Sequence, residues 1–164
     1  PLTKAALVVL RRMHPRSLAV SDLLGAANDL VGDDRLSSQE HLDIAKHLLF
    51  QLITSGLVQI QLRQPDFAAA AGEKPIASPF ARWQAVRAGA PLTSLAGFNL
   101  EPDNPAVIKL VKLLDGTRDR ESLTKEMYKL YEIPPESRGA AKTEIRNLLE
   151  THLQELANVA MLSA

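Results

Sequence analysis

The sequence contains no cysteine. The chain can therefore form neither a disulfide framework nor a metal site with thiolate ligands, and its composition fits a reducing compartment. It also lacks an excess of charge of either sign, because 19 lysines and arginines balance 19 aspartates and glutamates. Since nucleic-acid affinity is largely electrostatic, we expect no specific nucleic-acid partner and at most weak, non-specific binding to duplex DNA.

Segments that would address the chain to a membrane are absent as well. No apolar run in the sequence approaches the roughly 20 residues of a bilayer-spanning helix, and no signal peptide is visible. We therefore expect a cytoplasmic location and no membrane partner. The chain begins at Pro1 and not at a methionine, which predicts that it is a fragment of a longer protein.

The sequence also lacks the motifs of a catalytic or cofactor site. Its eight glycines are scattered as turn and cap residues, so no glycine-rich loop is present to hold a nucleotide or a methyl donor. Ser78 lies in Ala-Ser-Pro and not in a nucleophile elbow. His41 and His47 are six residues apart, a spacing that does not place two imidazoles on one helical face. We predict no catalytic residue, no metal site and no cofactor in this chain.

Helical patterns fill most of the chain. Hydrophobic residues make up 46% of the sequence and charged residues 23%, which is the composition of a globular protein. Apolar residues recur at helical spacing in six segments, and short runs between or after them predict strands. The predicted helices cover about residues 3–13, 21–31, 37–54, 104–114, 119–131 and 142–156, and the predicted strands cover residues 57–62, 95–100 and 159–162.

Capping residues mark several of these helix ends. Ser21 is a candidate N-cap, and the segment 37–40 matches a capping box, in which two side chains satisfy free backbone N–H groups. Asn104 followed by Pro105 is a strong start signal, and Asp119 is a further candidate N-cap. The apolar stripes of the first three helices predict a core of Ala6, Leu7, Leu10, Met13, Leu23, Leu24, Ala27, Leu30, Leu42, Ala45, Leu49 and Leu52.

The order of these elements repeats along the chain. Three helices followed by a strand is the order of a winged-helix unit, and the second half repeats it at an offset of about a hundred residues. We therefore predict a mainly α (α+β) fold with two tandem winged-helix-like units. The first unit covers residues 1–66, a linking stretch covers residues 67–93, and the second unit covers residues 94–164.

Two segments carry a family resemblance. Residues 73–85 read EKPIASPFARWQA, and residues 113–123 read LLDGTRDRESL. In this order they resemble the C-terminal winged-helix region of bacterial S-adenosylmethionine-dependent methyltransferases with a methyltransferase regulatory domain, which are protein-lysine-methyltransferase-like. The opening residues 5–18 are similar to the start of that region, although His14 replaces the usual aromatic residue.

The resemblance implies a non-catalytic role for this chain. In that family an N-terminal domain binds S-adenosylmethionine and transfers the methyl group, and some members methylate lysines of outer-membrane proteins. The C-terminal domains regulate the enzyme or position a protein substrate. The partners implied are therefore the methyltransferase domain of the parent protein and a protein substrate, and S-adenosylmethionine belongs to the parent's catalytic domain.

Two other functions are possible. The Leu-Leu-Asp-Gly-Thr pattern of residues 113–117, which leads into a helix, also resembles small winged-helix peptide chaperones. Small winged-helix chaperones present a precursor peptide to a modifying enzyme by adding it as a strand to an exposed sheet edge. Such a chaperone would bind its peptide without a catalytic domain. A DNA-binding winged-helix regulator is the third interpretation, and its affinity would fall steeply with salt.

The two resembling segments also supply the candidate residues. Arg82 lies between Phe80 and Trp83, and we predict that its guanidinium either pairs with Asp115 or Asp119 or stays exposed without a partner. The interaction or structural candidates are Pro75, Ser78, Pro79, Arg82, Trp83, Asp115, Gly116, Arg118 and Asp119.

Overall fold

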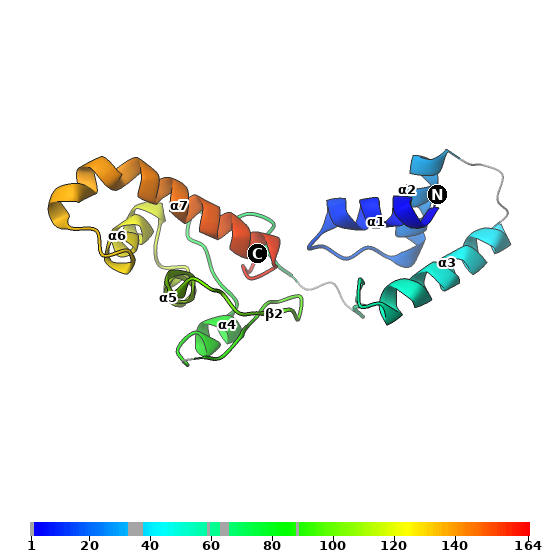
Figure 1. Ribbon diagram of the computed structural model, residues 1–164, viewed down its shortest axis with the longest axis horizontal. Coiled ribbons are helices and arrows are strands. Elements are labelled where there is room, and N and C mark those ends of the chain that lie inside the picture. The colour runs from blue at the N-terminus through cyan, green and yellow to red at the C-terminus, as the bar shows by residue number, and fades with distance from the viewer. Residues whose placement is uncertain (1, 33–37, 59, 63–65, 88) are drawn as a thin grey trace. The chain divides into compact units, whose positions relative to one another are not determined.

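The computed structural model describes residues 2–32, 38–58, 60–62, 66–87 and 89–164. The chain forms two compact units, Pro1–Gln64 and Pro65–Ala164 (Figure 1). Residues 67–93, which the sequence suggests as a linking stretch, pack within the second unit. Each unit has a hydrophobic core of its own, so the two are described separately.

The first unit consists of three helices: α1 (Leu2–Met13), α2 (Val20–Val31) and α3 (Ser38–Thr54). They bury a small core that is formed by Leu2, Ala5, Ala6, Val9, Leu23, Ala27 and Leu52. The prediction of a buried side chain is wrong at three positions, because Leu7, Leu30 and Leu42 are 36%, 48% and 46% exposed. The buried stripe of α1 runs through Leu2, Ala6 and Val9, so Leu7 lies beside it.

The ends of these helices differ from the sequence prediction at α2. The N-cap is Ala19, which makes no side-chain cap hydrogen bond, and the predicted cap Ser21 lies inside the helix. The predicted cap Ser37 lies outside the described residues. Gly56 follows α3 with a φ of +70°, the left-handed conformation that suits a helix C-terminus.

The predicted strand 57–62 is wrong for the described residues of that range, none of which belongs to a strand. Its apolar side chains are not buried on one face, since Leu57, Ile60 and Leu62 are 69%, 70% and 99% exposed. A strand requires a paired neighbour, and polarity alternation over six residues does not supply one.

The second unit begins with the short helix α4 (Pro79–Gln84) and a hairpin of β1 (Leu92–Thr93) and β2 (Asn99–Leu100). The strands pair antiparallel, with Leu92 opposite Leu100 and Thr93 opposite Asn99. Three helices follow: α5 (Pro105–Leu113), α6 (Arg120–Leu130) and α7 (Arg138–Asn158), with a 3-10 turn at Pro135–Ser137 before α7.

Two predicted strands of this unit are also corrected. The range 95–100 contains the hairpin turn, with Gly97 at a φ of +82°, and only its last two residues are strand. In the range 159–162 only Leu162 pairs, through an isolated bridge with Ala77. The last helix starts at Arg138, four residues before the predicted start, because the 3-10 turn leads directly into it.

The capping signals of the second unit are confirmed. Asn104 accepts a hydrogen bond from the Ala106 N–H at 2.9 Å, and Pro105 occupies the first helical position of α5. Asp119 accepts one from the Ser122 N–H at 2.8 Å at the start of α6. Both caps satisfy a backbone donor that the first turn of a helix leaves free.

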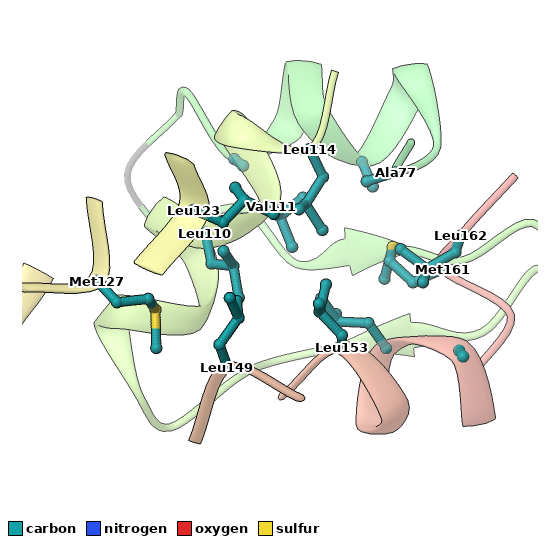
Figure 2. Close-up of a cluster of buried hydrophobic side chains, with 14 of the residues drawn as sticks. Ala77, Leu110, Val111, Leu114, Leu123, Met127, Leu149, Leu153, Met161 and Leu162 are labelled. Atoms are coloured by element: carbon teal, nitrogen blue, oxygen red, sulfur yellow. The ribbon is translucent and has the colours of Figure 1, made fainter. Parts of the chain in front are cut away.

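The core of the second unit lies between α5, α6, α7 and the segments around Ala77 and Leu162 (Figure 2). Ten large side chains are almost fully buried: Leu92, Leu110, Val111, Leu114, Leu123, Met127, Leu149, Leu153, Met161 and Leu162. Helix α5 contributes Leu110 and Val111 to this core, together with Leu114 just past its end. Ala81 and Ala85 pack α4 against the same core, since small side chains allow the helix to approach closely.

Candidate interaction surface

The structure brings the two resembling segments together. Ile76 forms an antiparallel bridge with Asp115, and the Ala77 N–H donates to the Leu114 carbonyl at 2.8 Å. The Gly116 N–H donates to the Pro75 carbonyl at 3.3 Å. The candidate residues Pro75, Asp115 and Gly116 thus meet at one junction, which precedes α4 and joins α5 to α6.

The C-terminal segment pairs with the opposite side of the same stretch. The Ser78 N–H donates to the Met161 carbonyl at 2.9 Å, and the Ser163 N–H donates to the Ile76 carbonyl at 2.8 Å. The Leu162 carbonyl accepts from the Ala68 N–H at 2.9 Å. A peptide that paired here as an added strand would have to displace segments of the chain itself.

The Asp115 carboxylate accepts several hydrogen bonds within the turn between α5 and α6. Its Oδ1 accepts from the Thr117 hydroxyl at 2.6 Å and from the Thr117 N–H at 3.0 Å, and its Oδ2 lies 2.7 Å from Arg118 Nη1. The Thr117 hydrogen bonds, with a smaller contribution from Arg118, hold the pKa of Asp115 well below its usual range. Arg118 also donates to the Leu113 carbonyl at 3.2 Å, so the pair fixes the turn between α5 and α6.

Acid should weaken this turn. The pKa of Asp115 is lower in the folded chain than in the unfolded chain, so its stabilising contribution is present above about pH 4 and is lost as the pH falls below that value. We expect Asp115→Asn to lower stability at neutral pH by about 1 kcal/mol and to flatten the loss of stability below pH 4. Urea unfolding at several pH values measures both. An equal difference between variant and wild type at every pH would contradict the prediction.

The predicted pair between Arg82 and Asp115 or Asp119 is wrong. Asp115 pairs with Arg118, and Asp119 caps α6, where the hydrogen bonds from Ser122 lower its pKa. Among the described residues Arg82 has no ion pair, and its buried Nε has no hydrogen-bond partner. The alternative, an exposed Arg82 without a partner, holds for the missing partner but not for the exposure, since the residue is half-buried.

Ser78 and Pro79 position the short helix α4. The Ser78 side chain, 3% exposed, caps the helix by accepting from the Ala81 N–H at 3.4 Å, and Pro79 occupies the first turn. At the other end, the Gln84 side chain donates to the Thr93 hydroxyl at 2.9 Å and accepts from the Thr93 N–H at 2.7 Å. The helix is therefore held to the core at both ends, although it has only six residues.

The outer face of α4 carries exposed aromatic side chains. Trp83, the only tryptophan of the chain, is 53% exposed and stacks on Phe80 with ring centroids 5.6 Å apart and planes inclined by 16°. The Arg87 guanidinium lies 3.4 Å from the centroid of the Trp83 ring. A stacked pair with a cation over it forms a firm platform.

One central residue escaped the sequence analysis. Arg120 joins three separate parts of the second unit: its Nε lies 2.7 Å from Glu150 on α7, and its guanidinium donates to the carbonyls of Ala71, Gly72 and Glu73 at 3.1, 2.7 and 3.4 Å. A signal was present, because a cation at the first position of a helix opposes the helix dipole. An arginine at this position therefore suggests a stabilising contact with a group outside its own helix.

The sequence also gave no indication of a network of polar side chains that links α5, α6 and α7. Tyr131 accepts from the Asn104 side chain at 2.9 Å and lies 2.9 Å from His152 Nε2, while His152 Nδ1 lies 3.1 Å from Glu155. His152 is 8% exposed and faces the core from α7. These hydrogen bonds satisfy both nitrogens of the buried His152 imidazole. Asn104, Tyr131 and His152 are far apart in the sequence, so no local pattern indicated that they would meet.

An open depression on α7 is lined by Glu150, Thr151, Gln154, Glu155 and Asn158, all from one helix. Among the described residues, no group of histidine and carboxylate side chains could hold a metal ion. In the same residues, no helix has the length and apolar character to cross a bilayer.

Comparison with known proteins decides the family. Residues 73–161, which include both resembling segments and helices α4 to α7, match the family described as PKMT, C-terminal winged helix domain. The chain belongs to this family. The match confirms the resemblance to protein lysine methyltransferases and the winged-helix fold class of the second unit. As a member of the PKMT winged-helix family, the chain is a domain that occurs in methyltransferases.

Solved structures show the same fold. PKMT2 from Rickettsia typhi matches with a TM-score of 0.71 and 18% identity, and PKMT2 in complex with AdoHcy matches with a TM-score of 0.72 and 20% identity. In each case 99% of the present chain is covered but only 34% of the Rickettsia chain. The chain thus spans about a third of the length of these structures. No curated protein matches it.

Proposed function

We propose that the chain is a non-catalytic domain that regulates a protein methyltransferase or positions its protein substrate. The observation that carries the proposal is the match of residues 73–161 to the PKMT C-terminal winged helix domain. Two further observations support the proposal. The α4 segment exposes a stacked pair of aromatic side chains, as protein-binding surfaces do. Charged groups of the second unit, such as the pairs Asp115–Arg118 and Arg120–Glu150, are engaged in holding the fold. The partner is the methyltransferase domain of the same polypeptide, and a protein substrate is the second partner.

We propose that S-adenosylmethionine is held outside this chain. PKMT2 from Rickettsia typhi has been solved with AdoHcy, and the present chain covers only 34% of that protein. Within the described residues, the hairpin β1–β2 is followed by Glu101 and α5 and not by a glycine-rich loop. The cofactor therefore belongs to the catalytic domain, and the whole protein works in the cytoplasm, where the donor is made.

Two measurements test this function. Calorimetry of the 164-residue chain with S-adenosylmethionine should give no binding heat, and a micromolar affinity would contradict the assignment of the donor to another domain. In the full polypeptide, deletion of this region should leave donor binding unchanged. It should lower methyl transfer from labelled donor to a purified outer-membrane protein, the acceptor class implied by the family, by about tenfold or more through lost positioning. Unchanged kinetics on that acceptor would leave the region only a role in stability.

A further inference from the structure

The outer side of helix α4 carries exposed aromatic side chains. Phe80 and Trp83 are 52% and 53% exposed. On the inner side, Ala81 and Gln84 of the helix and Ala85 just past its end are buried. Large apolar side chains that lie exposed together mark interaction sites, so the outer side of α4 is a candidate contact surface.

This exposed face has no counterpart in the described part of the second unit. The large hydrophobic side chains that are at least 36% exposed there all lie between residues 76 and 86: Ile76, Phe80, Trp83 and Val86. Phe80 and Trp83 are three residues apart on α4 and stack on each other, while Ile76 precedes the helix and Val86 follows it. We call these four residues and Arg87 the α4 platform.

The α4 segment itself carries only positive charge. Residues 75–100 contain two arginines, Arg82 and Arg87, and no aspartate or glutamate. Asp115, whose backbone pairs with Ile76, is engaged by Thr117 and Arg118. Arg87 covers the Trp83 ring. Tryptophan, phenylalanine and arginine are also the residues enriched at the centres of protein interfaces.

We propose that the α4 platform docks onto the methyltransferase domain of the same polypeptide. On this proposal the partner surface has an apolar hollow for Trp83 and Val86, and a carboxylate that meets Arg87. This inference rests on the proposed function and names the surface through which it acts. The platform is held in place before docking by the Ser78 cap and the Gln84–Thr93 hydrogen bonds, which lowers the entropy cost of binding.

A second copy of the chain is the weaker occupant. In a two-fold symmetric dimer the same patch meets itself, so Arg87 of one platform would face Arg87 of the other, while the nearby carboxylate of Asp115 is engaged by Thr117 and Arg118. A domain on the same polypeptide brings a different surface. It is also present at a high effective concentration, because the linkage makes docking an intramolecular event.

Hydrogen exchange tests the docking directly. Amide exchange of residues 79–87 is compared between the 164-residue chain and the full polypeptide, and we expect it to be about tenfold slower or more in the full polypeptide. Val86→Asp places a charge in the proposed hollow and should return this exchange to the rate of the 164-residue chain. Leu57→Asp is the matched control: Leu57 is 69% exposed and Val86 71%, but Leu57 belongs to the first unit. It should leave the protection intact.

The outcomes separate the inference from the function on which it rests. Equal exchange of residues 79–87 in both proteins overturns the docking surface, whereas methylation that still depends on this region keeps the proposed function. Val86→Asp that leaves the protection unchanged also overturns it. Sedimentation of the 164-residue chain checks the other occupant, since a dimer that Val86→Asp dissociates would assign the platform to a second copy.

Discussion

Replacing Arg120 by alanine is expected to destabilise the second unit by about 2–3 kcal/mol, since hydrogen bonds that involve a charged group each contribute about 1.5–3 kcal/mol when they are well formed. The side chain is 23% exposed and bonds to Glu150 and to three consecutive carbonyls, those of Ala71, Gly72 and Glu73. The variant loses all of these contacts at once. The exposed carbonyls can turn to water, which keeps the loss below the sum of the individual bonds.

Two control variants apportion this loss. Glu150 is 50% exposed, so Glu150→Ala removes a pair that is worth under about 1 kcal/mol and leaves the carbonyl contacts in place. Arg120→Lys keeps the charge but not the planar fork, and it should recover less than half of the loss. Urea unfolding followed by far-UV circular dichroism and by the emission of Trp83 measures each variant. If Glu150→Ala costs as much as Arg120→Ala, the ion pair and not the carbonyl cluster holds the segment.

The contrast between Arg82 and Arg120 shows where sequence reasoning ends. Arg82 drew attention because it stands between two aromatic residues, and its predicted carboxylate partners were chosen from a neighbouring motif. Asp115 instead pairs three residues away with Arg118, because the turn at Gly116 brings them together. Arg120 reaches carbonyls 47 to 49 residues earlier in the chain. Partners at such separations depend on the packing of whole elements, which periodicity does not specify.

Local capping signals were reliable in the second unit, although the predicted cap Ser21 of the first unit was wrong. Asn104 with Pro105 and Asp119 start their helices as predicted, because a cap is satisfied by the next two or three residues. The strands were wrong or misplaced, because a strand is stabilised by a neighbour that the sequence does not name. In α4 only the packing shows that Ala81 faces inward and that Phe80 and Trp83 lie outside.

The same reasoning predicts a large effect at Gly116. Its φ is +84°, and a Cβ added there would lie 2.9 Å from Ile76 Cγ1 and 3.0 Å from Ile76 Cδ1. We expect Gly116→Ala to destabilise the second unit by about 3 kcal/mol, which combines the strain of a left-handed backbone with the overlap. Ile76 cannot move away easily. It is β-branched, and its backbone is tied on one side to Asp115 and on the other to Ser163.

Gly97 separates the two contributions to this loss. It has a φ of +82° but nothing within 4 Å of an added Cβ, so Gly97→Ala carries the backbone strain alone, about 1 kcal/mol. Ile76→Ala removes both atoms that the new Cβ would meet. In that background Gly116→Ala should cost no more than Gly97→Ala does, and the difference is the coupling energy between the two segments. Denaturant unfolding of the four variants gives this cycle. A Gly116→Ala penalty that is unchanged by Ile76→Ala would mean that backbone strain alone, and not the close approach of the two family segments, requires glycine at this position.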